Sequence, residues 1–527
     1  MNDFTVYLKA NKNEKNNNFI EKVSQLHENS FVWQDNLITF VASGSTEIAH
    51  SVDGNLSIVF SGILQNKTEL FEELSIKEDF LKSEKQSEIL LYAFELWGAS
   101  LLSKIRGTFA FAIWNNEEKE LFVARDIFGV MPILYTKVSQ DLIVSNCVKT
   151  FFEITNFRKE LNERALEQYL SFGYNAGPEL FYKNIYRLFP SHYFRHKDYQ
   201  MQIKKYFLPK FTCDKEEKSF INQSCKDISD IVDKYEKNSV NFCENLEKNL
   251  VSKYEFISEM KKASKFLLSP NADFLCASIN RLFENTSETI SCIIGLETLF
   301  VLDENYLNCI NKIANNAKVI TRIFEKNQQL DEKKYIKLSD KKSEEIANAF
   351  LETKLIFSEK ARKRLLKNST KAQSPQEIIL PYYHINKEQT TISNMQFCDI
   401  NTSLSFDKVL KISSLAQGNN KKIVFPYLDI EIVKKALRMP ISLKIEAGKN
   451  PFKDKLQKNL NHCITQWFKD DDFYLSVKNY FESDNAKEFF SSDLLLKLLS
   501  EHRQEKTDNC QKILCVLSFL LWYETNF

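Results

Sequence analysis

The chain has 527 residues with 71 basic and 70 acidic side chains, so its net charge is +1. A composition of 43% hydrophobic and 27% charged residues is typical of folded globular proteins, and the length allows two to four domains, which excludes a disordered or fibrous chain. The balanced charge argues against binding nucleic acid through a broad basic face, and the longest apolar stretch, residues 513–523, is too short to cross a membrane.

The first 207 residues are rich in short strand patterns. Residues 56–60 alternate in polarity before a turn at Gly62, and the apolar segments 109–114, 121–124 and 142–144 predict three further strands. Residues 87–102 place apolar side chains at helical spacing, and Gly98 ends this helix. Because helices pack on antiparallel strands in α+β proteins, the sequence predicts an α+β domain over residues 1–207.

The remaining residues, 208–527, have a different pattern. Helical periodicity dominates 216–260, 301–314 and 343–366, whereas the short apolar runs 265–268 and 289–294 predict buried strands between helices. Strands that alternate with helices are typical of a parallel sheet. The sequence therefore predicts a helix-rich α/β domain over residues 208–527.

The chain offers few residues suited to cradling a phosphate or holding a metal. Of its 11 glycines, only Gly295, Gly418 and Gly448 follow Gly177, so neither a Walker A loop nor a dinucleotide fingerprint can be written. The 11 cysteines include no pair with a two-residue gap, and the seven histidines are scattered. We therefore expect no metal site, and we expect reduced thiols in a cytoplasmic protein, because the first residues also lack the pattern of a signal peptide.

Two segments carry a resemblance to a known family. Residues 105–114 read Ile-Arg-Gly-Thr-Phe-Ala-Phe-Ala-Ile-Trp and residues 121–132 read Leu-Phe-Val-Ala-Arg-Asp-Ile-Phe-Gly-Val-Met-Pro. Both resemble segments of asparagine synthetases and other class II glutamine amidotransferases. About 300 residues later, Phe-Pro-Tyr-Leu-Asp at 425–429 is similar to the Val-Pro-Phe-Leu-Asp block of the same family.

The resemblance implies a fold and an activity. It implies an N-terminal Ntn-hydrolase-like glutaminase domain, residues 1–207, followed by an ATP-pyrophosphatase (adenine nucleotide alpha hydrolase)-like domain, residues 208–527. Members of this family make amides by adenylating a carboxylate with ATP and Mg²⁺ and attacking it with ammonia or another amine.

The glutaminase positions that the resemblance identifies are only partly retained. The N-terminal cysteine nucleophile corresponds to Asn2, the first asparagine of the oxyanion segment to Ser61, and the acidic residue that holds glutamine to Gln86. Gly62 and Asn66 match the family. We interpret these two residues as a vestigial glutaminase pocket in which both serve as turn residues.

The synthetase positions are altered in a similar way. The resemblance places the pyrophosphate loop at residues 269–274, after the predicted strand; Ser269 and Asp273 match, whereas Pro270 and Phe274 replace family residues. Lys453 corresponds to a lysine that steadies developing charge, although a surface lysine in a basic stretch is an equal interpretation. No glycine occurs from 296 to 417, so the second signature of the site is absent. We expect no catalytic residue, and a vestigial nucleotide site of Ser269, Asp273 and Lys453.

Three functions remain open. The first is a pseudoenzyme that needs no cofactor and acts as a binding partner or regulator, with an active family paralogue as the candidate partner and without nucleic acid or membrane. It keeps the positions that hold the fold, which are Arg125, Asp126, Gly129, Pro132, Pro426 and Asp429. The second is a glutamine-independent, ATP- and Mg²⁺-dependent amide-forming enzyme of the asparagine synthetase, β-lactam synthetase or lasso-peptide cyclase type. The third is ordinary asparagine synthesis. Residues 519–523 could form a partner contact or pack on the protein's own core.

Overall fold

The computed structural model describes residues 3–10, 17–26, 29–75, 85–209, 218–237, 239–287, 289–300, 306, 343–368, 370–383, 391–439 and 464–527. The chain forms two compact units. The first consists of Met1–Asn162 and Pro178–Leu208, and the second of Glu163–Gly177 and Pro209–Phe527. The segment Glu163–Gly177 thus leaves the range 1–207 that the sequence assigns to the first domain.

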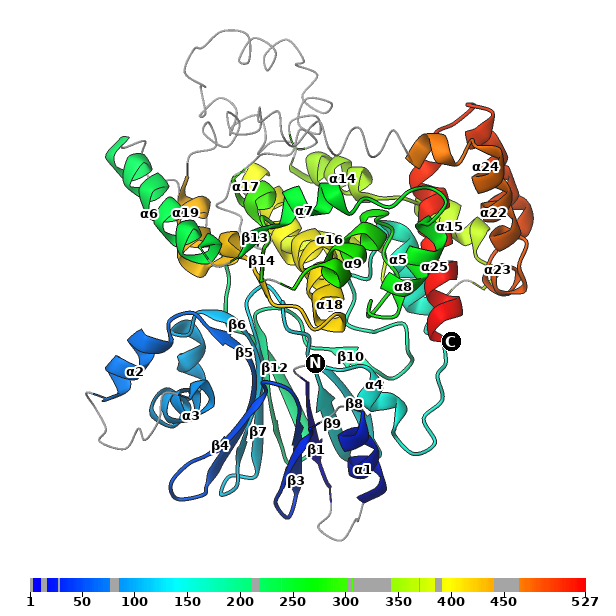
Figure 1. Cartoon of the computed structure of the whole chain (residues 1–527). Coiled ribbons are helices and arrows are strands. Elements are labelled where there is room, and N and C mark those ends of the chain that lie inside the picture. Colours follow the sequence, from blue (N-terminus) through cyan, green and yellow to red (C-terminus); the bar gives the residue numbers. More distant parts are fainter. Residues whose placement is uncertain are drawn as a thin grey trace. The chain divides into compact units, whose positions relative to one another are not determined.

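The first unit contains two six-stranded antiparallel sheets (Figure 1). One has the order β10-β8-β9-β1-β3-β2 and the other β12-β11-β7-β6-β5-β4. The strands of the first sheet are β1 (Phe4–Leu8), β2 (Phe31–Gln34), β3 (Ile38–Ala42), β8 (Leu134–Val138), β9 (Asp141–Ser145) and β10 (Tyr186–Arg187). Those of the second are β4 (Glu47–His50), β5 (Leu56–Leu64), β6 (Gly107–Asn115), β7 (Glu120–Arg125), β11 (His192–Lys197) and β12 (Gln200–Lys205). All four predicted strands are present, in β5, β6, β7 and β9.

Strand β6 is buried on both faces, and this burial explains why its sequence is apolar without interruption. Phe109 and Phe111 pack in a cluster with helix α3 (Gln86–Trp97), whereas Ala110 and Trp114 pack in a second cluster with residues of β1, β3 and β9. A strand buried on both faces has no polar face, so alternation is lost. With α1 (Asn17–Gln25) beside the first sheet and α2 (Lys67–Ser75) and α3 beside the second, the unit has helix, sheet, sheet and helix layers (Figure 1). The short helices η1 (Gly98–Ser103) and α4 (Lys149–Phe152) complete it.

The second unit is rich in helices around a small parallel sheet. Strands β13 (Val240–Asn241), β14 (Ile290–Ser291) and β15 (Ile423–Val424) have the order β13-β14-β15, and both pairs are parallel. The helices are α5 (Glu163–Phe172), α6 (Lys218–Glu236), α7 (Phe242–Lys248), α8 (Phe256–Ser264), α9 (Leu275–Asn285), α10 (Leu296–Phe300), α14 (Ser343–Lys354), α15 (Glu359–Leu365), α16 (Pro375–Tyr383), α17 (Thr391–Asp399), the π-helix η2 (Ile400–Val409), α18 (Leu410–Gly418), the 3₁₀ turn η3 (Pro426–Leu428), α19 (Ile430–Arg438), α22 (Asp471–Phe481), α23 (Asp484–Phe489), α24 (Ser492–Arg503) and α25 (Cys510–Asn526). The predicted parallel sheet is therefore confirmed.

One predicted strand is wrong. Residues 265–268 form the turn that follows α8 and do not belong to a sheet. Leu267 is buried, and its carbonyl oxygen accepts a hydrogen bond from Nε1 of Trp522 at 3.0 Å, so a side chain takes the place of a neighbouring strand. The predicted strand at 289–294 contains β14. The predicted helix at 301–314 lies outside the described residues, apart from Tyr306, which is helical.

The apolar C-terminal stretch belongs to the core of its own unit. Phe519, Leu520, Leu521 and Trp522 are each at most 1% exposed in α25. These side chains are therefore unavailable as a contact surface, and the alternative of a closing helix packed on its own core is confirmed. Among the described residues, no helix combines the length and apolarity that a membrane crossing requires.

Candidate functional site

The segment at 121–132 builds a buried loop. Arg125, at the end of β7, is 1% exposed and donates hydrogen bonds to the carbonyl oxygens of Met131, Leu188 and Gly129 at 2.7, 2.6 and 2.6 Å. Asp126 accepts three hydrogen bonds from backbone N–H groups within 128–131. Burial lowers the pKa of Arg125 to about 10, although Asp126 opposes this shift, so the guanidinium stays charged at neutral pH. These two residues hold a loop together.

Gly62 is required by the contact between two strands. It lies inside β5, opposite Phe109 of β6, with φ of +143°, so the prediction of a turn at this glycine is wrong: the strand continues to Leu64. A Cβ atom at this position would lie 2.2 Å from the carbonyl oxygen of Thr108, so no larger residue fits without moving the strand. The close contact between β5 and β6 therefore explains why residue 62 is glycine, without any bound substrate.

Asn66 joins the end of β5 to the segment before β6. Its Oδ1 accepts a hydrogen bond from the backbone N–H of Arg106 at 2.8 Å, and its Nδ2 donates to the carbonyl oxygen of Lys104 at 2.9 Å. Gln86 acts similarly, because its Oε1 accepts from the N–H of Leu64 at 2.6 Å. Asn2 lies outside the described residues. The geometry thus gives both amide side chains structural partners.

Replacing Asn66 with alanine should destabilise the protein by about 1–3 kcal/mol, because a buried N–H and a buried carbonyl lose their partner. Urea unfolding followed by circular dichroism measures this. The matched control is Asn116→Ala, whose side chain only accepts a hydrogen bond from the surface residue Lys119; it should change stability by less than about 0.5 kcal/mol. Equal stability of the two variants would contradict the structural role of Asn66.

The loop at 269–274 connects α8 to α9, so its expected position after a strand is corrected. Ser269 is half-buried in this loop. The carboxylate of Asp273 forms an ion pair with Nζ of Lys411, whose side chain is only 5% exposed. The same ammonium lies 3.3 Å from Oδ1 of Asp407. Burial alone lowers the pKa of Lys411, but the two carboxylates more than offset this effect and raise it above its ordinary value.

The backbone N–H groups of the loop already have protein acceptors. Ala272 donates to the carbonyl oxygen of Gly173 at 2.8 Å, and Asp273 donates to Oδ1 of Asn271 at 3.0 Å. The N–H of Leu275 donates to Oδ1 of Asp273 at 2.9 Å, and that of Cys276 to the carbonyl oxygen of Asp273 at 3.1 Å. A phosphate cradle needs N–H groups directed at the ligand. Two N–H groups of this loop and two at the start of α9 are therefore already bonded to acceptors of the protein.

The topology of the parallel sheet indicates a second candidate position for a bound ligand, which the sequence did not reveal. In open α/β sheets, ligands bind beyond the carboxyl ends of the parallel strands. At this edge Asn241 begins α7, and its Oδ1 accepts from the N–H groups of Cys243 and Glu244 at 2.9 and 3.3 Å. Glu244 also adds a carboxylate to the first turn. Strands of two residues give no sequence pattern, which is why the edge was missed.

The neighbouring strands end in packed turns at the same edge. After β14, Gly295 has φ of +102°, and a Cβ there would lie 2.6 Å from Cδ2 of Leu428. After β15, Asp429 caps α19: its Oδ1 accepts from the N–H of Glu431 at 2.9 Å, and its Oδ2 accepts from the hydroxyl of Tyr235 at 3.1 Å. The block at 425–429 therefore stabilises the start of a helix.

Lys453 lies outside the described residues. Within the described ranges, no group of three or more His, Cys, Asp or Glu side chains is arranged to hold a metal ion. The chemistry of the described side chains is thus one of internal ion pairs and backbone capping.

Comparison with known proteins gives matches to both halves of the chain. A family model described as a glutamine amidotransferase domain matches residues 41–207, and one described as asparagine synthase matches residues 317–524. Asparagine synthetase [glutamine-hydrolyzing] 1 of Bacillus subtilis (strain 168) is 22% identical, and the match covers 92% of this chain and 88% of that protein. A putative asparagine synthetase [glutamine-hydrolyzing] of Mycobacterium tuberculosis (strain H37Rv) is 31% identical over 29% of this chain and 24% of its own length.

Among solved structures, glutamine phosphoribosylpyrophosphate amidotransferase of B. subtilis, complexed with ADP and GMP, has a TM-score of 0.29 and 13% identity. That match covers 40% of this chain and 50% of the other, which is too low a similarity to support an argument. The two family models occur in the expected order, and the first B. subtilis enzyme is matched along most of its length. The chain therefore belongs to the asparagine synthetase family, with an N-terminal glutamine amidotransferase domain and a C-terminal asparagine synthase domain.

Proposed function

We propose that this chain is a non-catalytic member of its family that acts by binding another protein, as a partner or regulator of an active family paralogue in the cytoplasm. The observation that carries the proposal is the internal use of backbone N–H groups at both places where a nucleotide phosphate would be held. The N–H groups of Ala272, Asp273, Leu275 and Cys276 donate to protein acceptors. The side chain of Asn241 accepts from two N–H groups at the start of α7.

Charge supports the proposal for the nucleotide site. Lys411 is already shared between two carboxylates, and Glu244 adds a negative charge beside the start of α7. A polyphosphate would have to break the ion pair or face an unpaired carboxylate. Losing two or three charge-assisted hydrogen bonds, each worth about 1.5–3 kcal/mol, weakens binding by several orders of magnitude.

The amidotransferase domain supports the same proposal. Asn2 has no sulfur, and Cys147 is the first cysteine in the chain. Burial raises the pKa of Cys147 to about 12, so this side chain is a neutral thiol at physiological pH and a poor nucleophile. At the family position whose carboxylate holds the amino group of glutamine, this chain has Gln86, and the amide oxygen of Gln86 accepts a hydrogen bond from the N–H of Leu64. The domain thus offers neither a thiolate nor a charge to hold the amino group of glutamine.

A second function has one observation in its favour. The asparagine synthase model matches residues 317–524, and this range includes Lys453. A glutamine-independent, amide-forming enzyme would use ATP and Mg²⁺, with Ser269, Asp273 and Lys453 as its nucleotide site. The two functions differ in one measurable property, the affinity for ATP.

The purified chain should give no calorimetric signal with ATP and Mg²⁺ at micromolar concentrations, no ATP–pyrophosphate exchange and no glutamate from glutamine. An active asparagine synthetase measured in parallel is the positive control. Micromolar ATP affinity that disappears in Asp273→Ala would support the amide-forming enzyme instead. Glutamate release that is lost on substitution of Asn2 would also contradict the proposal.

The binding role has its own readout. Affinity purification from the native cell should recover a family paralogue, and the mixture of the two purified proteins should elute earlier in size-exclusion chromatography than either alone. A strictly monomeric chain that forms no such complex, and whose deletion leaves related amide-forming pathways unchanged, would rule the binding role out.

A further inference from the structure

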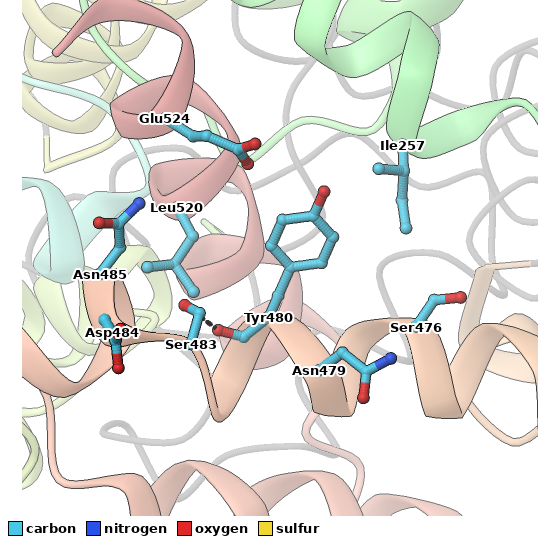
Figure 2. A pocket seen from close by; sticks show the side chains of 9 residues that line it. All are labelled: Ile257, Ser476, Asn479, Tyr480, Ser483, Asp484, Asn485, Leu520 and Glu524. Carbon is cyan, nitrogen blue, oxygen red and sulfur yellow. Dashed lines mark hydrogen bonds between the residues drawn. The ribbon is translucent and has the colours of Figure 1, made fainter.

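A polar pocket lies in the second unit, away from the parallel sheet residues described above. It has a volume of about 620 Å³, within the range of roughly 300–1,000 Å³ that is usual for small-molecule sites. Figure 2 shows its walls, which come from α8, α22, the start of α23 and α25. We call it the α22–α25 pocket.

The pocket stands on packed helices. Next to the lining residues, α22 buries Phe473, Val477 and Phe481, and α25 is buried along most of its length. Ser483 caps α23: its Oγ accepts from the N–H of Ala486 at 3.2 Å and donates to the carbonyl oxygen of Tyr480 at 2.7 Å (Figure 2). The walls are therefore formed before any ligand arrives.

Two carboxamides in the lining are available to a ligand. Within the described residues, no protein group hydrogen-bonds the side chains of Asn479 or Asn485. The hydroxyl of Ser476 donates to the carbonyl oxygen of Asp472 at 2.9 Å and can still accept. Carboxamides supply both donors and acceptors, which is the complement of an alcohol hydroxyl group.

The charges of the lining favour an uncharged ligand. Glu524 is paired with Lys261 at 2.8 Å, and Asp484 lies 3.6 Å from Lys487. A cationic ligand would compete with these lysines and an anionic ligand with these carboxylates, because each carboxylate already has a lysine partner. Nζ of Lys261 also lies 5.5 Å from the centre of the Tyr480 ring. A neutral ligand leaves both pairs intact.

The apolar part of the lining suits the carbon face of a ring. Leu520 and Ile257 lie on two sides of the pocket, and the ring of Tyr480 extends between them and Glu524 (Figure 2). Because Leu520 is only 1% exposed, the half-buried Ile257 and the ring of Tyr480 supply most of the apolar surface. Sugar rings present hydroxyl groups at their edges and C–H groups on their faces, so they match carboxamides and apolar side chains together.

We propose that the α22–α25 pocket binds an uncharged, hydroxyl-rich small molecule that carries a sugar ring, with the carboxamides of Asn479 and Asn485 as its hydrogen-bonding groups. The chemistry is shared by free saccharides and by uncharged nucleosides. This site is separate from the nucleotide positions above, and its occupation does not depend on the proposed function.

The test is saturation-transfer difference NMR on the full chain. D-glucose and maltose represent free saccharides, and adenosine represents an uncharged nucleoside. Glucose 6-phosphate and AMP are the charged counterparts of glucose and adenosine. At least one neutral probe should give a saturable signal, and Asn479→Ala/Asn485→Ala should weaken its binding by about tenfold or more. Asn368→Ala, an exposed asparagine elsewhere in the unit, should leave the affinity unchanged.

The different probes distinguish the possible ligands. A signal from the saccharides alone or from adenosine alone identifies the source of the ring. The proposal is overturned if no neutral probe gives a signal at about 10 mM, if a charged counterpart binds as tightly as its neutral form, or if the double variant binds as well as Asn368→Ala. A thermal melt of each variant checks that folding is retained.

Discussion

Replacing Arg125 with methionine should destabilise the first unit by about 3–5 kcal/mol or prevent it from folding. The guanidinium is buried and donates to three carbonyl oxygens, so the variant leaves these acceptors without a partner. It also leaves Asp126, which is 1% exposed, as a buried carboxylate without its neighbouring cation. Methionine fills much of the volume but offers no donor.

Urea unfolding of the full chain, followed by tryptophan fluorescence and circular dichroism, measures this loss. The matched control is Arg195→Met on β11, whose guanidinium is paired with Glu120 at 2.8 Å and is 36% exposed. Exposed ion pairs contribute little, so the control should lose less than about 1 kcal/mol. If Arg125→Met were no less stable than the control, the loop at 126–131 would not be held together as described.

Lys411→Met should cost the second unit about 3–5 kcal/mol, because it removes the one charge that lies between Asp273 and Asp407. Adding Asp273→Asn to this variant should restore part of the stability, since it removes one of the two carboxylates that the lysine neutralises. The double-mutant cycle should therefore show a coupling of about 1–3 kcal/mol. Lys435→Met is the control, because its pair with Asp227 is partly exposed.

The pH dependence of this pair has a definite sign. The pKa of Lys411 is raised in the folded state, so its contribution is fully present below the ordinary lysine pKa and is lost as the pH rises through the folded-state value. Between pH 6 and 9, Lys411 should therefore stay protonated in the folded protein. Its titration should not reduce the difference in free energy of unfolding between wild type and Lys411→Met in this pH range. In the double-mutant cycle described above, additive effects of Lys411→Met and Asp273→Asn on the free energy of unfolding would show that Lys411 and Asp273 are not coupled.

Much of the first unit could be predicted from the sequence. The run at 109–114 identified a strand because its residues are apolar on both faces, and β6 is indeed buried on both faces. The family was evident from the same segment. The role of Arg125 and Asp126 in holding the fold could be predicted because most of their hydrogen-bond partners lie in the loop that directly follows them. The carbonyl oxygen of Leu188, which accepts from Arg125, is the distant exception.

The site of the second unit could be predicted only in part, for two physical reasons. Short apolar runs do not distinguish a buried strand from a buried turn, so 265–268 was assigned to a sheet. The partner of Asp273 is 138 residues away along the chain, and an isolated lysine in a helix gives no sign of such a pairing. Strands β13 and β15, with two residues each, are set by their neighbours in the sheet rather than by local pattern.

The excursion of Glu163–Gly177 into the second unit has a consequence for synthesis on the ribosome. The hydroxyl of Tyr169 in α5 donates to the carbonyl oxygen of Cys515 at 2.8 Å, and these residues are 346 positions apart. At about 5–20 residues per second, this partner emerges ~20–70 s after α5 does. During that interval α5, whose buried residues include Leu166, Leu170 and Phe172, lacks its contact with α25. The packing around α5 is therefore complete only when translation is nearly finished, and a cut after residue 208 would separate this helix from the rest of its unit.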